Sequence, residues 1–293
     1  MILVTGATGF VGGHLIKRLI AEGYKIRCLV RDPSKASMII SAGAEPVTGD
    51  ISEPESLKEA VSGVEKVIHL VGIIQEGKGF TFKSVHVDGT KNLIEVSKNG
   101  GVRFFYYQSA LGASKDGKTE YFRTKWEAEE IVQGSGLSYT IFRPSIIYGA
   151  SDKFTLKLMD ILRKTPVMPI FGSGDSLLQP IYIDDLITCI IKVLEDQQYH
   201  NRIFEIGGPE HITYEDIVNA IQQAIGKERM KLHIPVNILK PGIKFLEEIL
   251  STPPITTDQL TMLMMDNICE RDSVRKNFGF EPLPFREGLK RFL

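Results

Sequence analysis

A glycine-rich turn close to the amino terminus constrains this chain more than any other feature. The apolar run 2–4 predicts a short strand that is buried on both faces. Gly6, Gly9 and Gly12 follow it at three-residue spacing, and leucines and isoleucines then recur at helical intervals. A strand, a glycine turn and a helix in this order are typical of a nucleotide site, because glycines let a pyrophosphate approach the unpaired N–H groups at a helix start. A tight turn that binds no ligand remains the alternative.

Apolar runs and amphipathic segments alternate from this turn to about residue 150. Further strands are predicted at 25–30, 45–47, 66–71, 104–108 and 139–142, with helices between them. Such alternation predicts an α/β fold with a Rossmann-type, doubly wound parallel sheet. We expect residues 1–150 to form an NAD(P)-binding domain, residues 175–210 to return to it, and residues 151–293 to form a smaller α/β lobe that binds the substrate.

Three short patterns predict where helices begin. Ser52 followed by Glu55 predicts a capping box, and Thr213 followed by Asp216 predicts another helix start. Asp184 and Asp185 are expected to cap a helix rather than to act as a catalytic carboxylate pair.

The end of the second predicted strand bears on the choice of cofactor. A dinucleotide fold places there the group that meets the adenosine ribose, and an acid at this point binds the 2′-hydroxyl of NAD. This chain has Val30 and then Arg31, with Lys35 close behind and Asp32 one step late. Because a guanidinium holds a 2′-phosphate through two hydrogen bonds, the pattern favours NADP over NAD. Arg31 as a solvated loop charge is the alternative.

A tyrosine and a lysine at helical spacing are the candidate catalytic pair. Tyr121 and Lys125 lie four residues apart, so a helix puts both on one face. An ammonium near a phenol stabilises the phenolate and is expected to lower the pKa of Tyr121 toward neutrality, where it can exchange a proton. Ser109 directly follows the fifth strand and can orient a carbonyl, with Ser114 as the alternative. His69 lies within a strand and is expected to be a hydrogen-bonded core histidine.

Five segments together resemble an extended or atypical short-chain dehydrogenase/reductase, and more narrowly the branch around the nucleotide-binding accessory subunit of respiratory complex I. They are TGATGFVG, SVHVDGTKNLIEVS, YFRTK, FRPSIIYG and QPIYIDDL, and the resemblance covers residues 1 to about 210. The resemblance implies that Tyr121 is the proton donor or acceptor, that Lys125 also bonds the nicotinamide ribose, and that Ser109 polarises the substrate carbonyl.

The same resemblance implies a set of cofactor contacts. The three glycines would carry the pyrophosphate, and other residues would line the turn, flank the adenine, pass beneath its ribose and lie along the nicotinamide. In that order these residues are Thr8, Phe10 and Val11; Asp50 and Ile51; Leu70, Val71 and Gly72; and Pro144, Ile146 and Ile147. Val30 replaces the acid usual in NAD-dependent relatives, which again favours NADP.

Composition excludes several partners. Lysine and arginine number 35 against 36 acidic residues, so nothing suggests a nucleic-acid partner. The three cysteines are odd in number and show no C-x-x-C pair, which indicates a reducing compartment and neither a zinc site nor a disulfide framework. No 18-residue apolar run occurs and the first strand leaves no room for a signal peptide, so we expect a cytoplasmic protein without a membrane span.

The last third offers one unusual segment, at 260–265. It carries Met262, Met264 and Met265, which suit core packing but also a lipophilic channel, a partner groove or a membrane edge. Peripheral membrane contact and oligomer formation therefore stay open.

These patterns favour an NADP-dependent oxidoreductase that moves hydride between a nicotinamide and a carbonyl or alcohol substrate. The sequence does not identify that substrate. A nucleotide-sugar epimerase or dehydratase would use the same residues. A dinucleotide-binding scaffold or redox sensor would need the glycine turn but no Tyr-Lys pair.

Overall fold

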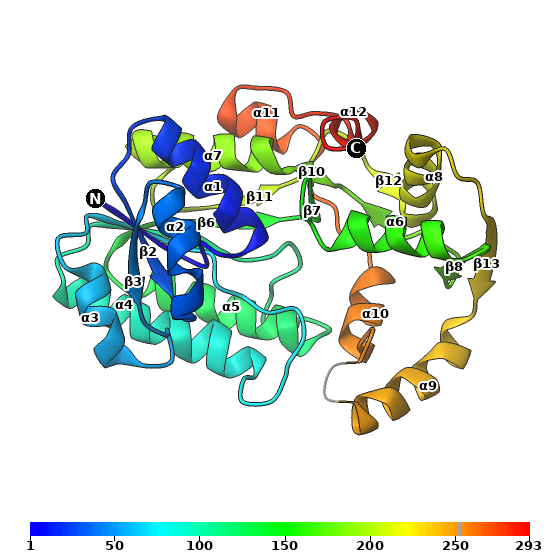
Figure 1. The fold of residues 1–293 in the computed structure, drawn as a ribbon, viewed down its shortest axis with the longest axis horizontal. Helices are drawn as coiled ribbons and strands as arrows, with labels where there is room; N and C mark the ends of the chain where they lie inside the picture. The colour runs from blue at the N-terminus through cyan, green and yellow to red at the C-terminus, as the bar shows by residue number, and fades with distance from the viewer. Residues whose placement is uncertain (251–252) are drawn as a thin grey trace. The chain divides into compact units, whose positions relative to one another are not determined.

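The structure, a computed structural model, describes residues 1–250 and 253–293. It divides into two compact units (Figure 1). The first comprises Met1–Arg143 and Ile187–Phe204, and the second comprises Pro144–Leu186 and Glu205–Leu293.

The first unit is built on a sheet of seven strands. Its order is β11-β6-β5-β4-β1-β2-β3, and the strands from β6 across to β3 pair in parallel. The strands are β1 (Ile2–Thr5), β2 (Ile26–Val30), β3 (Glu45–Thr48), β4 (Lys66–His69), β5 (Phe104–Gln108), β6 (Ser138–Pro144) and β11 (Arg202–Ile206). Crossover helices between parallel strands and a strand order that reverses beside β1 define a Rossmann-type, doubly wound sheet. The predicted fold class is confirmed.

Helices cover both faces of this sheet. Figure 1 shows α1 (Phe10–Ala21) and α7 (Ile183–Glu195) on one face, and α3 (Pro54–Val61), α4 (Gly89–Asn99) and α5 (Glu120–Gln133) on the other. Leu57, Leu93 and Val132 of the second group pack with Leu3, Val67 and Phe105 of the sheet in one apolar core. Smaller elements are a 3₁₀ turn (Pro33–Lys35), α2 (Ala36–Ser41) and a 3₁₀ turn (Gln197–Tyr199).

Two of the predicted helix starts are wrong. Helix α3 begins at Pro54 after an uncapped Glu53, because Ser52 turns back and donates to Asp50 Oδ1 at 2.8 Å. Asp184 and Asp185 lie inside the first turn of α7 and do not precede it, and Asp185 Oδ2 accepts from Leu283 N at 2.8 Å.

Other local predictions are confirmed. Thr213 caps α8 (Tyr214–Ile225) by accepting from Asp216 N at 3.0 Å. His69 is a core histidine, since Thr5 Oγ1 and Thr90 Oγ1 lie 2.6 and 3.1 Å from its two ring nitrogens.

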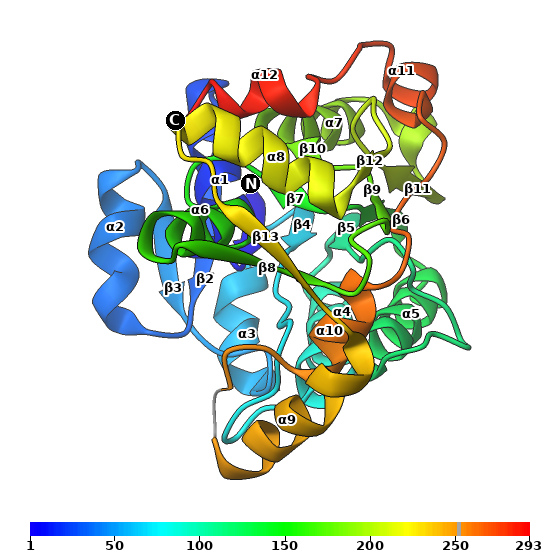
Figure 2. The same cartoon turned by 90° about the vertical axis from the view of Figure 1, so that its right-hand side faces the viewer.

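The second unit combines short strand pairs with helices. Strand β8 (Val167–Phe171) runs parallel to β13 (Met230–Ile234), as Figure 2 shows. The pairs β7 (Ile147–Tyr148) with β10 (Ile181–Tyr182) and β9 (Leu177–Leu178) with β12 (Ile212–Thr213) are shorter. Its remaining helices are α6 (Phe154–Lys164), α9 (Val236–Ile249), α10 (Thr257–Leu263), α11 (Ser273–Phe278) and α12 (Phe285–Leu289).

The methionine segment falls at the end of α10, and its three methionines are half-buried. A Cβ atom on Gly172 would lie 2.4 Å from Met264 Cε, so this methionine packs directly against a glycine. That contact agrees with the packing role expected of the segment.

Candidate active site

The glycine turn between β1 and α1 uses its three glycines for different purposes. Gly6 has a φ of +77°, which favours glycine, and its carbonyl accepts from Gly9 N at 2.9 Å. A Cβ atom on Gly12 would lie 2.2 Å from Gly6 O, so Gly12 is required by packing within the turn. Gly9 is exposed, and a Cβ atom there would meet only Gly6 O, at 3.2 Å. The open side of the turn is therefore at Gly9.

Helix α1 begins directly after Gly9 without a side-chain cap. Its first-turn N–H groups thus have no side-chain oxygen as a partner, and they carry the positive end of the helix dipole. Thr8 and Phe10 are half-buried beside the open glycine, and Val11 is buried below it. The turn fits a diphosphate, since backbone donors and an exposed glycine meet at one point.

The group expected to read the adenosine ribose is an exposed cation with one long ion-pair contact. The side chain of Arg31 is 74% exposed, and its Nε lies 3.9 Å from Asp50 Oδ2. Asp32 folds back on its own turn, where Oδ1 accepts from Ser34 N at 3.0 Å and from Ser34 Oγ at 2.7 Å. Lys35 is exposed beside it. The acid one step past the strand end is thus engaged locally, whereas the guanidinium is available.

The strand ends next to β1 come together beneath the glycine turn. A Cβ atom on Gly6 would lie 3.0 Å from the carbonyl carbon of Leu70 and 3.1 Å from Val71 N. Ile51 is buried, and its carbonyl accepts from Asn92 Nδ2 at 3.0 Å. The structure therefore brings the glycine turn and the segment after β4 into direct contact, as a shared ligand site requires.

Lys125 is buried and is held at the carboxyl end of β5. Its Nζ donates to Gln108 O at 2.8 Å and lies 4.9 Å from the centre of the Tyr107 ring. The position of a Cβ atom on Gly72 is only 3.2 Å from the same Nζ. Burial lowers the pKa of Lys125 to about 8, while the Glu129 carboxylate acts in the opposite direction. The ammonium therefore links β5, helix α5 and the chain after β4.

Tyr121 does not have the electrostatic environment that its spacing predicts. Its ring packs edge-on against Phe82 and His86, with centroids 5.9 and 5.6 Å away. Burial raises the pKa of Tyr121 to about 12, so the expected lowering toward neutrality is wrong for the protein alone. The cause is that the Lys125 ammonium is directed to Gln108 O, and the phenol loses water without gaining a cation.

Two buried polar atoms beside the Lys125 contact lack partners among the described residues. They are Ser109 Oγ and Gln108 Oε1. Buried polar atoms are nearly always hydrogen-bonded, so two neighbouring ones without a partner at a strand end are candidates for contact with a bound group. Ser114, the alternative to Ser109, is exposed in the following loop. The geometry favours Ser109.

Sequence reasoning missed His86. One turn of π-helix, Lys83–Asp88, precedes α4 and turns this histidine inward. Its Nε2 accepts from Ile73 N at 3.1 Å, so its Nδ1 carries the proton that faces Thr124 Oγ1 at 3.0 Å. Burial lowers the pKa of His86 to about 2, and the histidine stays neutral. His86 therefore joins the chain after Gly72 to helix α5. It was missed because no periodic pattern in the sequence predicts a π turn.

Glu129 is a second residue that the sequence did not single out. It is fully buried one turn beyond Lys125, and both its oxygens accept from the Arg143 guanidinium, at 2.6 Å for the shortest contact. The Glu129 carboxylate therefore lies near Lys125 but forms its hydrogen bonds with Arg143.

The nicotinamide-facing residues implied by the resemblance belong to the second unit or its border. Pro144 ends β6, Ile146 and Ile147 lead into β7, and Ser145 between them donates from N to Ile206 O at 2.8 Å. Their role toward the cofactor stays a prediction. Across the described residues, no group of three histidine, cysteine or acidic side chains is arranged to hold a metal ion.

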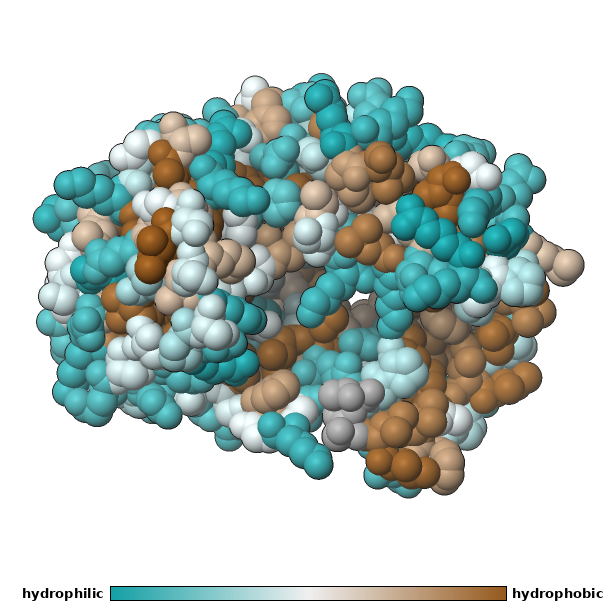
Figure 3. Space-filling view, viewed as in Figure 1, coloured by the Kyte–Doolittle hydropathy of each residue, from teal (hydrophilic) through white to brown (hydrophobic). Residues whose placement is uncertain are grey.

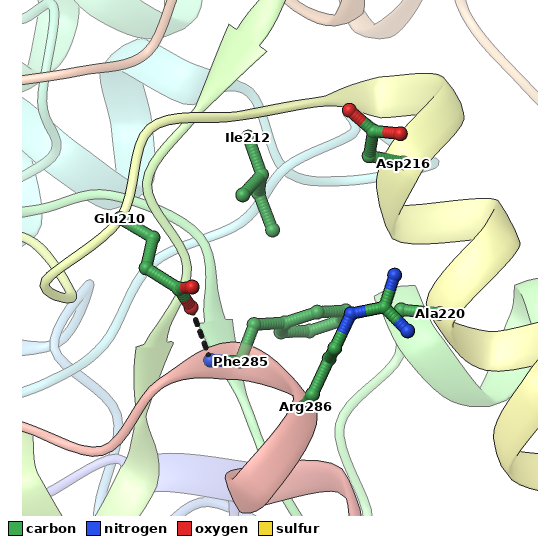
Figure 4. Close-up of a pocket in the computed structure, with 6 residues that line it drawn as sticks. All are labelled: Glu210, Ile212, Asp216, Ala220, Phe285 and Arg286. Carbon is green, nitrogen blue, oxygen red and sulfur yellow. Dashed lines mark hydrogen bonds between the residues drawn. The ribbon is translucent and has the colours of Figure 1, made fainter.

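A cavity in the second unit lies apart from these residues in the sequence (Figure 4). Its volume is about 210 Å³, and Glu210 Oε2 at its edge accepts from Phe285 N at 2.8 Å. Ile212, Asp216, Ala220 and Arg286 complete its lining. It contains none of the predicted site residues.

Comparison with known proteins defines the class. Residues 1–272 match the NmrA-like family, and the chain belongs to that family, within the extended short-chain dehydrogenase/reductase superfamily. The crystal structure of gox2253 is 25% identical and covers 99% of this chain and 95% of its own, with a TM-score of 0.76.

Two similar proteins carry names of different functions. The NADH-ubiquinone oxidoreductase 40 kDa subunit of Neurospora crassa is 26% identical over 95% of this chain and 75% of its own. Ceramide reductase of Caulobacter vibrioides is 33% identical over 63% of this chain, which spans only 58% of the reductase. The predicted resemblance is confirmed.

Proposed function

We propose that this protein is an NADP-dependent oxidoreductase that moves hydride between nicotinamide and a carbonyl or alcohol carbon. The observation that carries the proposal is the buried Lys125 ammonium, which donates to Gln108 O at the end of β5, together with Ser109 Oγ on the following residue, which has no partner among the described residues. A structural lysine needs no free hydroxyl beside it, whereas a site that binds a carbonyl needs a positioned donor. The named activities of the two relatives, an NADH-linked subunit and a reductase, agree with this class.

Each residue has a defined task in this proposal. The bound nicotinamide supplies or accepts the hydride. Ser109 Oγ donates to the substrate oxygen, and Tyr121 gives or takes the proton there. Lys125 donates to the nicotinamide ribose and, by approaching Tyr121, favours its phenolate. The unpartnered Ser109 and the buried cation support these tasks.

Dinucleotide binding is tested at the open glycine. We expect Gly9→Ala to weaken binding of NADPH about tenfold or more, because its methyl group projects where a diphosphate must approach. Gly13→Ala is the matched control, since the nearest atom to its Cβ is 4.0 Å away. Calorimetry on both variants decides the point. Equal NADPH affinity in the two variants would mean that the diphosphate does not bind at this turn.

The preference for NADP is tested at the exposed cation. We expect Arg31→Ala to weaken NADPH binding about tenfold or more, the loss of a charge-assisted hydrogen bond to a 2′-phosphate, and to change NADH binding little. Fluorescence titration with both coenzymes measures the ratio. A variant that loses both coenzymes equally would contradict a phosphate-reading role.

A non-catalytic, dinucleotide-binding scaffold or redox sensor is the second candidate. Its support is that the pKa of Tyr121 is raised to about 12 and that its hydroxyl has no hydrogen bond among the described residues. The relative named as a respiratory subunit agrees with such a role. A small-molecule substrate, peripheral membrane contact and a cytoplasmic location stay predictions for either candidate.

A further inference from the structure

Strands β2 and β3 end side by side and place an acid next to Arg31. The two strands pair in parallel, and at their ends Gly49 N donates to Val30 O at 3.1 Å. Arg31 and Asp50 are the next residues of the two segments, and Arg31 Nε lies 3.9 Å from Asp50 Oδ2. Among the residues that the structure describes, Asp50 is the one acid within ion-pair distance of this guanidinium. The cation proposed to read the coenzyme thus has a carboxylate beside it.

The Asp50 carboxylate is held in place, whereas the Arg31 guanidinium is not. Asp50 Oδ1 accepts from Ser52 N at 2.9 Å and from Ser52 Oγ at 2.8 Å, and Asp50 N donates to Ser56 Oγ at 3.0 Å. These bonds leave Oδ2 to face Arg31, whose side chain is 74% exposed against 25% for Asp50. A contact of 3.9 Å to so exposed a side chain orients the guanidinium only weakly. Asp50 therefore acts on Arg31 mainly through its charge.

The charges around Arg31 are balanced. Two cations, Arg31 and Lys35, and two acids, Asp32 and Asp50, follow the ends of β2 and β3. Asp32 turns back on its own loop, where Oδ1 accepts from Ser34 N at 3.0 Å. With two acids against two cations, this part of the first unit attracts an anion weakly, and removal of one acid would leave a net positive charge.

We propose that Asp50 is a specificity-determining residue that limits the preference for NADP over NAD at this site. A 2′-phosphate carries close to two negative charges at neutral pH. When bound to Arg31 it comes within about 10 Å of the Asp50 carboxylate, roughly the Debye length at 0.1 M salt, so the two anions repel one another. The neutral 2′-hydroxyl of NAD meets no such repulsion. The role of Asp50 rests on the proposed function, because it requires a coenzyme phosphate at Arg31.

Fluorescence titration with NADPH and NADH measures this role as a ratio of two affinities. We expect Asp50→Asn to raise the ratio of NADPH affinity to NADH affinity about threefold to tenfold, because one repelling charge is removed. The asparagine keeps an Oδ1 atom that can accept from Ser52, so the turn is preserved. A contact between residue 50 and the adenine would act on both coenzymes alike and cancel in the ratio. If Asp50→Asn does not fold by circular dichroism, Asp50→Ser removes the same charge and should raise the ratio likewise.

Two control variants remove one negative charge elsewhere. Glu65 is exposed and directly precedes β4, so it lies at the opposite edge of the parallel sheet from Arg31. Glu248 is exposed on α9 of the second unit, where Figure 3 shows apolar residues gathered. Within the described ranges neither α9 nor any other helix is long and apolar enough to cross a membrane. Glu65→Gln and Glu248→Gln should both keep the wild-type ratio.

The outcomes separate the role of Asp50 from the proposed function. An unchanged ratio in Asp50→Asn, measured while Arg31→Ala lowers the ratio, would overturn the role of Asp50 and leave the proposed function standing. A lower ratio in Asp50→Asn would overturn it too, because Asp50 would then orient the guanidinium. An equal rise in Glu65→Gln would do the same, because the net charge of the chain would be the cause. A wild type that binds neither coenzyme would contradict the proposed function and the role of Asp50 together.

Discussion

Tyr121→Phe should lower kcat by about 10²–10⁴-fold while the affinity for NADPH stays within about twofold, as loss of a positioned proton donor predicts. The ring remains, so its packing against Phe82 and His86 is preserved and only the hydroxyl is lost. NADPH consumption with a panel of aldehydes, ketones and quinones measures turnover, and calorimetry measures affinity.

Tyr139→Phe is the control for this substitution. Tyr139 is a partly buried tyrosine on β6 that packs against the apolar core of the first unit, away from Phe82 and His86. It should turn over as the wild type does. A Tyr121→Phe protein with full activity would exclude this tyrosine as the proton donor. If the wild type binds NADPH but consumes none with any carbonyl compound, the scaffold is favoured instead.

The fold was readable from the sequence because its signals are local. Residues 2–4 and 104–108 are short apolar runs, and only a parallel sheet covered on both faces buries such runs completely. The glycine turn was readable for the same reason, since Gly6 needs a left-handed backbone and Gly12 has no room for a Cβ atom. These demands concern neighbours within a few residues.

The electrostatics of the site were not readable because they depend on distant neighbours. Helical spacing correctly put Tyr121 and Lys125 on α5, but it said nothing about Gln108 O, which takes the ammonium. His86 was missed because its inward direction arises from a π turn and from Ile73 N, thirteen residues earlier. The error at Asp185 has a similar cause, because this residue accepts from Leu283, 98 residues later; Ser52 differs, because it bonds to Asp50 only two residues away and not to the helix that follows it.

Lys125→Met should lower turnover strongly and yet stabilise the folded protein. We expect kcat/KM to fall about 10²-fold or more, since the proposed donor to the nicotinamide ribose is lost, and with it the cation that is proposed to approach Tyr121 in the bound state. The burial that lowers the pKa of Lys125 from 10.5 to about 8 corresponds to a cost on the order of 3 kcal/mol for the charged form at neutral pH. The substitution also leaves the Gln108 carbonyl without its hydrogen bond, which costs about 1–3 kcal/mol. The net free energy of unfolding should therefore rise by about 1 kcal/mol.

The pH dependence of the free energy of unfolding tests whether the cost of burying the Lys125 ammonium is real. Between about pH 8 and 10.5 the unfolded chain holds a proton on Lys125 that the folded chain has lost, so the free energy of unfolding rises with pH across that window. Lys125→Met removes this rise, and its advantage over the wild type should therefore shrink from pH 7 to pH 10 in urea unfolding. Wild-type kcat/KM should fall above about pH 8, as the ammonium deprotonates. Lys91→Met, on an exposed lysine of α4, should change neither property. A stability difference that is constant with pH would mean that burial at the end of β5 does not lower the pKa of Lys125.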